Sequence, residues 1–242
     1  LAFEGLIERC GDRLSGTPRQ APALTQPVRL FTHGQEHHSL GGPSIRVPKT
    51  AEVLRALGVR AQSAAYDRRI AFDEPVAHIF NVWNPVTALA AITDAREKGK
   101  VVVFSPIFLD LGGFSFWQHE LPGLLAADPP PDPARIALEY ARAQQQQTCR
   151  NRLYEPMPGY HSAVRQMIAL SDHIVLLSQA EKAALEAIGV DFSTKPHSLI
   201  RNPVDADAWA DADPDLFRQA HGGGDYVLSV GRIEPRKNQM ML

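Results

Sequence analysis

The stretch Val227–Leu242, VLSVGRIEPRKNQMML, combines residue types that suit phosphate chemistry. Residues 225–230 predict a buried strand, Gly231 permits a turn, and Arg232, Arg236 and Lys237 place three cations where a helix should begin. An arginine fork matches phosphate oxygens, lysine adds a point charge, and a helix N-terminus contributes its own positive field. The pattern predicts a phosphate-binding loop, and its alternative is a solvated basic turn.

A second loop, residues 34–43, joins a short strand to a helical pattern and contains Gly41 and Gly42. Paired glycines let backbone N–H groups approach an anion closely, although they equally suit a tight turn. The following helix is expected to begin at Pro43 or at Pro48. His37 and His38 in this loop lack the HExxH spacing and any partner cluster, so we expect no metal site.

A third loop follows the apolar run 101–104 and contains Ser105 and Asp110. Loops after the carboxyl ends of parallel strands are where ligands bind in open α/β sheets. Ser105 and Asp110 are therefore candidate acceptor or substrate contacts. An ordinary structured turn explains the same residues equally well.

The elements that would position these loops alternate between short apolar runs and helical patterns. This alternation predicts an α/β fold, a Rossmann-like parallel sheet with helices on both faces. A capping box at Ser178 and Glu181 marks one helix start, with Glu181 expected to reach back to the first backbone N–H. The expected strands are 28–32, 60–66, 76–80, 100–104, 173–177 and 197–200, and the clearest helices are 85–97 and 178–189.

Composition shifts suggest three segments. Residues 1–27 form a linker or the end of an upstream module, and residues 28–203 form the sheet domain. Residues 204–242 form a connection and the first strand and phosphate loop of a second domain. Residues 106–158 read as an insertion on the ligand side of the sheet, with a proline-rich spacer followed by a polar helix over 136–147. Because this chain begins at Leu1 and ends just after a strand and turn, we expect it to be a segment of a longer protein.

Bulk composition excludes several classes of protein. The 242 residues carry a formal net charge of -2, so no global positive field argues for nucleic acid. Cys10 and Cys149 have no metal-ligand or disulfide-framework spacing. The apolar runs are too short to span a bilayer, and no signal peptide is apparent. We therefore expect a cytoplasmic protein, with peripheral association at the inner face of a membrane as the open alternative.

Taken together, these loops resemble the GT-B fold retaining glycosyltransferases of the group-1, family 4-like kind. Gly41–Gly42 resembles the glycine loop of that family, and the segment from Asp172 to Lys182 resembles its strand followed by S-x-x-E. Residues 200–205 resemble its I-P-N-G-V-D boundary, with Pro203 where glycine is usual. Residues 230–238 resemble V-G-R-x-x-x-x-K-N closely. The resemblance runs from about Val28 to the end of the chain.

The resemblance implies an enzyme that moves a sugar from a UDP- or GDP-linked donor to a glycan or lipid-linked acceptor, in cell-surface polysaccharide biosynthesis. Gly231, Arg232 and Lys237 would contact the donor diphosphate, with Gly41 and Gly42 approaching from across a cleft. No cofactor or metal is implied. The family's histidine near the end of the strand at Val103–Pro106 is missing, so the catalytic residues stay unassigned. Its paired glutamates would lie beyond Leu242, so this segment alone should be inactive.

Two other readings remain open. One is a binding module that recognises a glycan or protein without chemistry, and the other is a nucleotide-sugar epimerase of the same fold. Phe114, Phe116 and Trp117 suit stacking on a sugar, or equally a local hydrophobic cluster.

Overall fold

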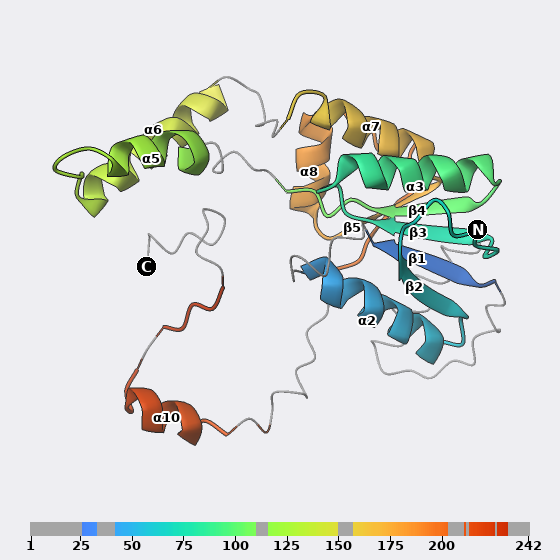
Figure 1. The fold of residues 1–242 in the computed structure, drawn as a ribbon, viewed down its shortest axis with the longest axis horizontal. Coiled ribbons are helices and arrows are strands. Elements are labelled where there is room, and N and C mark those ends of the chain that lie inside the picture. The colour runs from blue at the N-terminus through green and yellow to red at the C-terminus, as the bar shows by residue number, and fades with distance from the viewer. Residues whose placement is uncertain are drawn as a thin grey trace. The chain divides into compact units, whose positions relative to one another are not determined.

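The computed structural model of this protein describes residues 26–32, 42–109, 116–149, 157–202, 211, 213–225 and 227–231. The chain divides into two units (Figure 1). Unit 1 comprises Leu1–Leu109 and Met157–Arg201, and unit 2 comprises Asp110–Pro156 and Asn202–Leu242. Residues 110–156 lie within the stretch that we expected to form an insertion, and they belong to the same unit as the C-terminal segment 202–242. The last boundary falls two residues before the one expected from the sequence.

Unit 1 is built on a six-stranded parallel sheet with the order β2-β1-β3-β4-β5-β6, a Rossmann-like α/β layout. Each strand lies within two residues of its predicted bounds at either end. Since β2 and β3 flank β1 on opposite sides, the strand order reverses direction beside β1. The strands are β1 Val28–Thr32, β2 Ala61–Ala65, β3 Val76–Phe80, β4 Val101–Ser105, β5 His173–Leu176 and β6 His197–Leu199.

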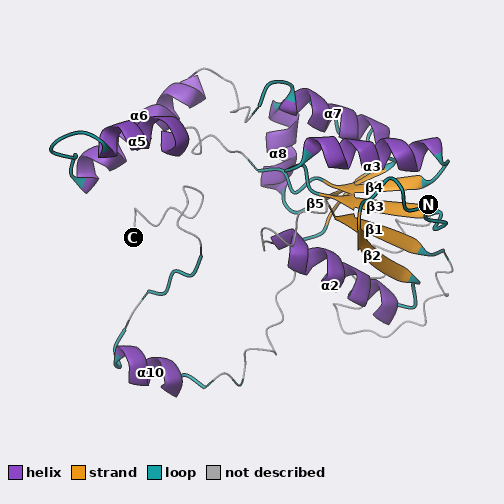
Figure 2. Ribbon diagram, viewed as in Figure 1, coloured by secondary structure: helices purple, strands orange, loops and turns teal. Residues whose placement is uncertain are grey.

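The inner strands are apolar on both faces because helices cover both. Every residue of β3 and β5 is buried, whereas the edge strand β2 is largely exposed. The helices among the described residues of unit 1 are α2 Gly42–Ala56, α3 Pro85–Glu97, α7 Tyr160–Leu170 and α8 Gln179–Ala187 (Figure 2). Alternate strand residues face opposite sides, so one set packs on α2 and the other on α3.

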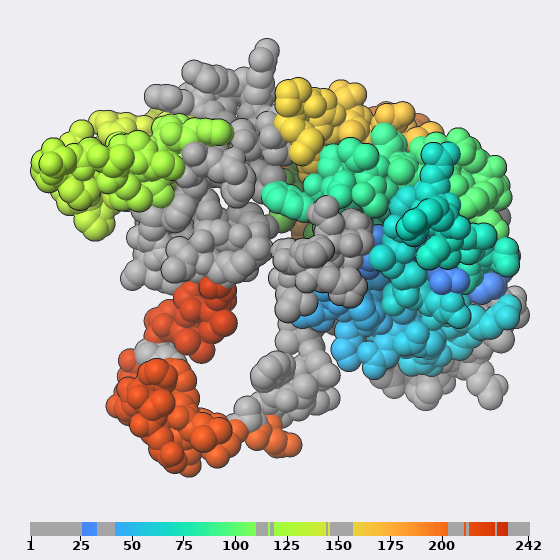
Figure 3. All heavy atoms as spheres, in the orientation of Figure 1, coloured from blue at the N-terminus to red at the C-terminus, as the bar shows by residue number. Residues whose placement is uncertain are grey.

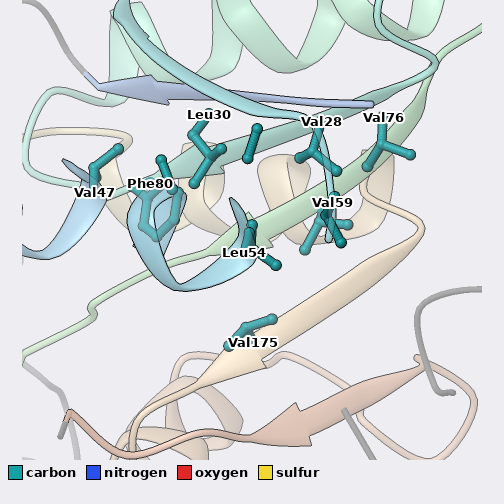
Figure 4. Packing of buried hydrophobic residues seen from close by; sticks show 11 residues of the cluster. Val28, Leu30, Val47, Leu54, Val59, Val76, Phe80 and Val175 are labelled. Carbon is teal, nitrogen blue, oxygen red and sulfur yellow. The ribbon is translucent and has the colours of Figure 1, made fainter. Parts of the chain in front are cut away.

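The packing around α2 shows this alternation (Figure 4). Val47, Ala51 and Leu54 of α2 join one buried cluster with residues of five strands, among them Leu30 and Phe80. The helix begins at Gly42 and runs through Pro48, so the alternative start at Pro48 is wrong. Proline lacks the N–H that would close this turn, and the burial of Val47 and Ala51 on either side of it stabilises the helix across the gap.

In its described part, unit 2 contains helices and irregular segments. A π-helical turn η1, Phe116–Glu120, leads into α5, Leu121–Leu125, and α6, Pro133–Cys149, contains the predicted polar helix. Phe116 is buried against Tyr140 with ring centroids 5.3 Å apart, which favours the hydrophobic-cluster interpretation for this aromatic. The last helix, α10, Asp215–His221, has no buried residue and is drawn in orange-red in Figure 3.

The predicted strand at residues 225–230 is wrong for the residues that the structure describes. Asp225 and residues 227–230 form no strand, and Val227 and Val230 are 86% and 82% exposed. A strand requires a neighbour to satisfy its backbone hydrogen bonds, and no paired strand lies beside this segment in the described residues of unit 2.

Candidate functional site

Two loops at the carboxyl edge of the sheet in unit 1, one after β3 and one after β4, are joined by backbone hydrogen bonds. At the end of β3, Asn81 has a φ of 75°, and its N–H donates to the carbonyl of Ser105 at 2.8 Å. The N–H of Val82 donates to the carbonyl of Pro106 at 2.9 Å. In the second turn, which follows β4, Ile107 has a φ of 52°. Strained residues of this kind persist where the surrounding structure fixes them, and they concentrate at functional sites.

The first of these turns presents Trp83 to solvent, with 55% of its surface exposed. The N–H of Trp83 donates to the side-chain oxygen of Asn81 at 2.9 Å, and Asn84 caps α3 by accepting from the N–H of Thr87. Both asparagines therefore fix the backbone on either side of the indole. An aromatic ring held in this way on a ligand-side edge is a rigid platform for an apolar or sugar face.

Glu181 holds the second turn in place from the first turn of α8. It is 5% exposed, and its two carboxylate oxygens accept from the N–H of Phe108 at 2.7 Å and from the N–H of Leu177. The Ser178 hydroxyl caps α8 by accepting from the N–H of Glu181 at 3.1 Å, as predicted. The prediction that the Glu181 carboxylate accepts from the N–H of Ser178 is wrong. The carboxylate instead connects the β5–α8 turn to the loop after β4.

Arg46, one turn into α2, supplies the positive charge that faces this buried carboxylate. Its guanidinium lies 5.7 Å from the centre of the Phe80 ring. Burial lowers the pKa of Arg46, and the charge of Glu181 opposes that shift. Burial raises the pKa of Glu181, while the N–H donors of Leu177 and Phe108 and the charge of Arg46 favour its ionised form. One terminal nitrogen of Arg46 is buried and has no hydrogen-bond partner among the residues that the structure describes.

His78 and Ser105 form a buried pair below the same edge. The Nε2 atom of His78 lies 2.9 Å from the Ser105 hydroxyl, and the imidazole stacks on Phe80 with ring centres 4.0 Å apart. Burial lowers the pKa of His78 to about 3, and the positive charge of Arg46 acts in the same direction. The histidine is therefore neutral near pH 7. Ser105 is fully buried, so its hydroxyl is engaged by His78 instead of facing solvent as a substrate contact would.

The other predicted site residues are distributed over both units. Gly42 is the first residue of α2, and a Cβ added there would meet no atom within 4 Å. The space around Gly42 therefore does not itself require glycine. Gly231 is exposed in unit 2. The remaining predicted contacts lie outside the described residues: Gly41, Asp110, Arg232 and Lys237.

His37 and His38 lie outside the described residues, and within those residues no group of three or more histidine, cysteine or acidic side chains is placed to hold a metal ion. Among the helices that the structure describes, none has the length and apolar character needed to cross a bilayer.

Sequence reasoning missed Arg46, His78 and Trp83. Two of them carried a usable signal, because Arg46 lies four residues after Gly42 on one helix face and Trp83 directly precedes the Asn-Pro helix start. His78 gave none, since a histidine within an apolar run is more often a core residue. No protein-family model and no curated protein matches this chain.

Proposed function

We propose that this chain belongs to a glycosyltransferase that moves a sugar from a nucleotide-sugar donor to a glycan or lipid-linked acceptor. The observation that carries the proposal is the reversal of strand order beside β1, with α2 beginning at Gly42 immediately after the β1 loop. In doubly wound sheets, ligands bind outside the carboxyl ends of the strands at such a reversal. The motif resemblance of residues 230–238 supports the same activity.

In this proposal unit 1 is the acceptor-side domain of a GT-B enzyme. Trp83 offers an exposed aromatic surface for a sugar ring, and the backbone on either side of it is fixed by Asn81 and by Asn84. Arg232 and Lys237, with the backbone of Gly231, would stabilise the negative charge that develops on the departing diphosphate. Gly41 and Gly42 would supply backbone N–H groups to the same diphosphate. The catalytic residues remain unassigned.

The test is calorimetric titration of UDP and of GDP into the full-length gene product that contains this chain. Arg232→Ala and Lys237→Ala are each expected to weaken binding of the preferred nucleotide about tenfold or more, because each removes a charge-assisted bond to phosphate. Arg218→Ala is the matched control, since Arg218 is an exposed arginine of α10 paired with Asp215 at 3.3 Å. If the correctly folded Arg232 and Lys237 variants bind the nucleotide with unchanged affinity, the loop is a solvated basic turn and does not bind the diphosphate.

A binding module without transfer chemistry is the second candidate. One observation favours it: His78 and Glu181, two acid and base candidates near this edge, are committed to internal hydrogen bonds. Neither is positioned as a free general base. If the full-length protein binds UDP or GDP but releases no sugar from UDP- or GDP-sugars with any tested glycan, the binding role replaces the enzymatic one.

A further inference from the structure

A cavity of about 680 Å³ lies at the opposite edge of the sheet in unit 1, where the strands begin. It is bounded by the start of β1, the end of α2, the start of β2 and the segment before β3. Its size falls in the range of small-molecule sites, which is roughly 300–1,000 Å³. Neither the sequence motifs nor the proposed sugar transfer uses this edge.

Three arginines line the cavity, each from a different element. Arg29 of β1 pairs with Glu74 at 2.7 Å, and its Nε atom is buried without a hydrogen-bond partner in the described part of the chain. Arg55 of α2 donates to the carbonyl of Ala61 at 3.2 Å. Arg60, just before β2, is exposed and forms no ion pair with the described residues. Since a guanidinium has five N–H donors, Arg55 and Arg60 retain most of theirs for a ligand.

Two lysines extend this positive region beyond the arginines. The ammonium groups of Lys98 and Lys100 lie 5.1 Å and 5.6 Å from the centre of the Phe72 ring, and Phe72 lines the cavity. The opposing carboxylates are those of Glu74 and Asp94, already paired with Arg29 and Lys98, and that of Asp73. The local balance is therefore positive in a chain whose formal net charge is -2.

We propose that this cavity binds a small phosphorylated molecule, with its phosphoryl group held by Arg55 and Arg60. Planar arginine forks match phosphate oxygens, and a doubly charged phosphoryl group balances the local excess of cations. Gln62 lines the same cavity and offers an amide to a neutral part of the ligand, such as a hydroxyl group. This site is separate from the carboxyl edge and does not depend on the proposed sugar transfer.

The test uses pyrophosphate as the probe and isothermal calorimetry as the measurement. The titrated protein carries Arg232→Ala and Lys237→Ala, so that the predicted phosphate loop does not contribute to the heat. Pyrophosphate is expected to bind, and adding Arg60→Ala is expected to weaken that binding about tenfold by removing a charge-assisted contact. Arg60 is exposed, so this variant should fold normally.

Two further variants sharpen the outcome. Asp73→Asn removes a carboxylate that lines the cavity and forms no ion pair with any described residue, and it is expected to tighten binding about threefold, because a like charge is lost. Arg68→Ala changes an exposed arginine outside the cavity lining and should leave the affinity unchanged. Absence of pyrophosphate binding, or equal binding in the Arg60→Ala and Arg68→Ala proteins, would overturn the proposal. Hydrogen exchange that slows at residues 60–63 on adding pyrophosphate would locate the site here.

Discussion

Replacing Glu181 with alanine is expected to destabilise unit 1 by about 3 kcal/mol, because the change leaves one buried and one partly buried backbone donor without this acceptor. The N–H groups of Phe108 and Leu177 both donate to this carboxylate. The guanidinium of Arg46 would also lose the carboxylate that faces it, and a partly buried charge without its counterion adds to the cost. Urea unfolding followed by circular dichroism measures the difference in the free energy of unfolding.

The matched control lies on the same helix. Glu186 of α8 is partly exposed and sits 3.7 Å from Lys182, so Glu186→Ala should change stability by no more than about 0.5 kcal/mol. In the Glu181→Ala protein, hydrogen exchange at Phe108 and Leu177 should accelerate relative to the other amides of the loop and strand. Equal stability of the two alanine variants would show that Glu181 is an ordinary helix-start residue.

Glu181 also shows where prediction from the sequence reaches its limit. The local spacing to Ser178 correctly predicts the helix start, because a cap depends on residues within one turn. The bond to Phe108 joins residues 73 positions apart, and no local pattern specifies such a partner. The same limit applies to His78 and Ser105, which meet only because β3 and β4 are neighbours in the sheet.

The parallel sheet itself was predictable because its signals are local. Unbroken apolar runs at 101–104 and 174–176 are typical of strands buried on both faces, and both runs lie within strands of the structure. The run at 227–230 carries a similar pattern and forms no strand. Apolar character predicts that a segment favours burial, but a strand also needs a paired neighbour. That requirement explains why the same apolar pattern predicts strands correctly in unit 1 and wrongly at residues 227–230 of unit 2.

Lowering the pH from 7 to 5 is expected to destabilise the native protein by about 2 kcal/mol through His78 alone. The folded-state pKa of about 3 lies below the ordinary value of 6.5, since burial and the charge of Arg46 disfavour the imidazolium. Between these two values the unfolded chain binds a proton that the folded chain does not. Stability is therefore lost progressively as the pH falls below about 6.5. Well above that pH, protonation of His78 no longer changes the free energy of unfolding.

The His78→Gln variant isolates this contribution from those of other titrating groups. Glutamine places a side-chain nitrogen or oxygen near the position of Nε2, so it retains a partner for the Ser105 hydroxyl without a proton to gain. The stability loss between pH 7 and pH 5, measured by urea unfolding, should be about 2 kcal/mol smaller in this variant than in the wild type. Nuclear magnetic resonance of the native protein gives an independent check, because the His78 ring should remain neutral at pH 5. A ring that titrates near pH 6.5 in the folded protein would mean that the carboxyl edge of the sheet admits water, and the buried pair would then be accessible to a substrate.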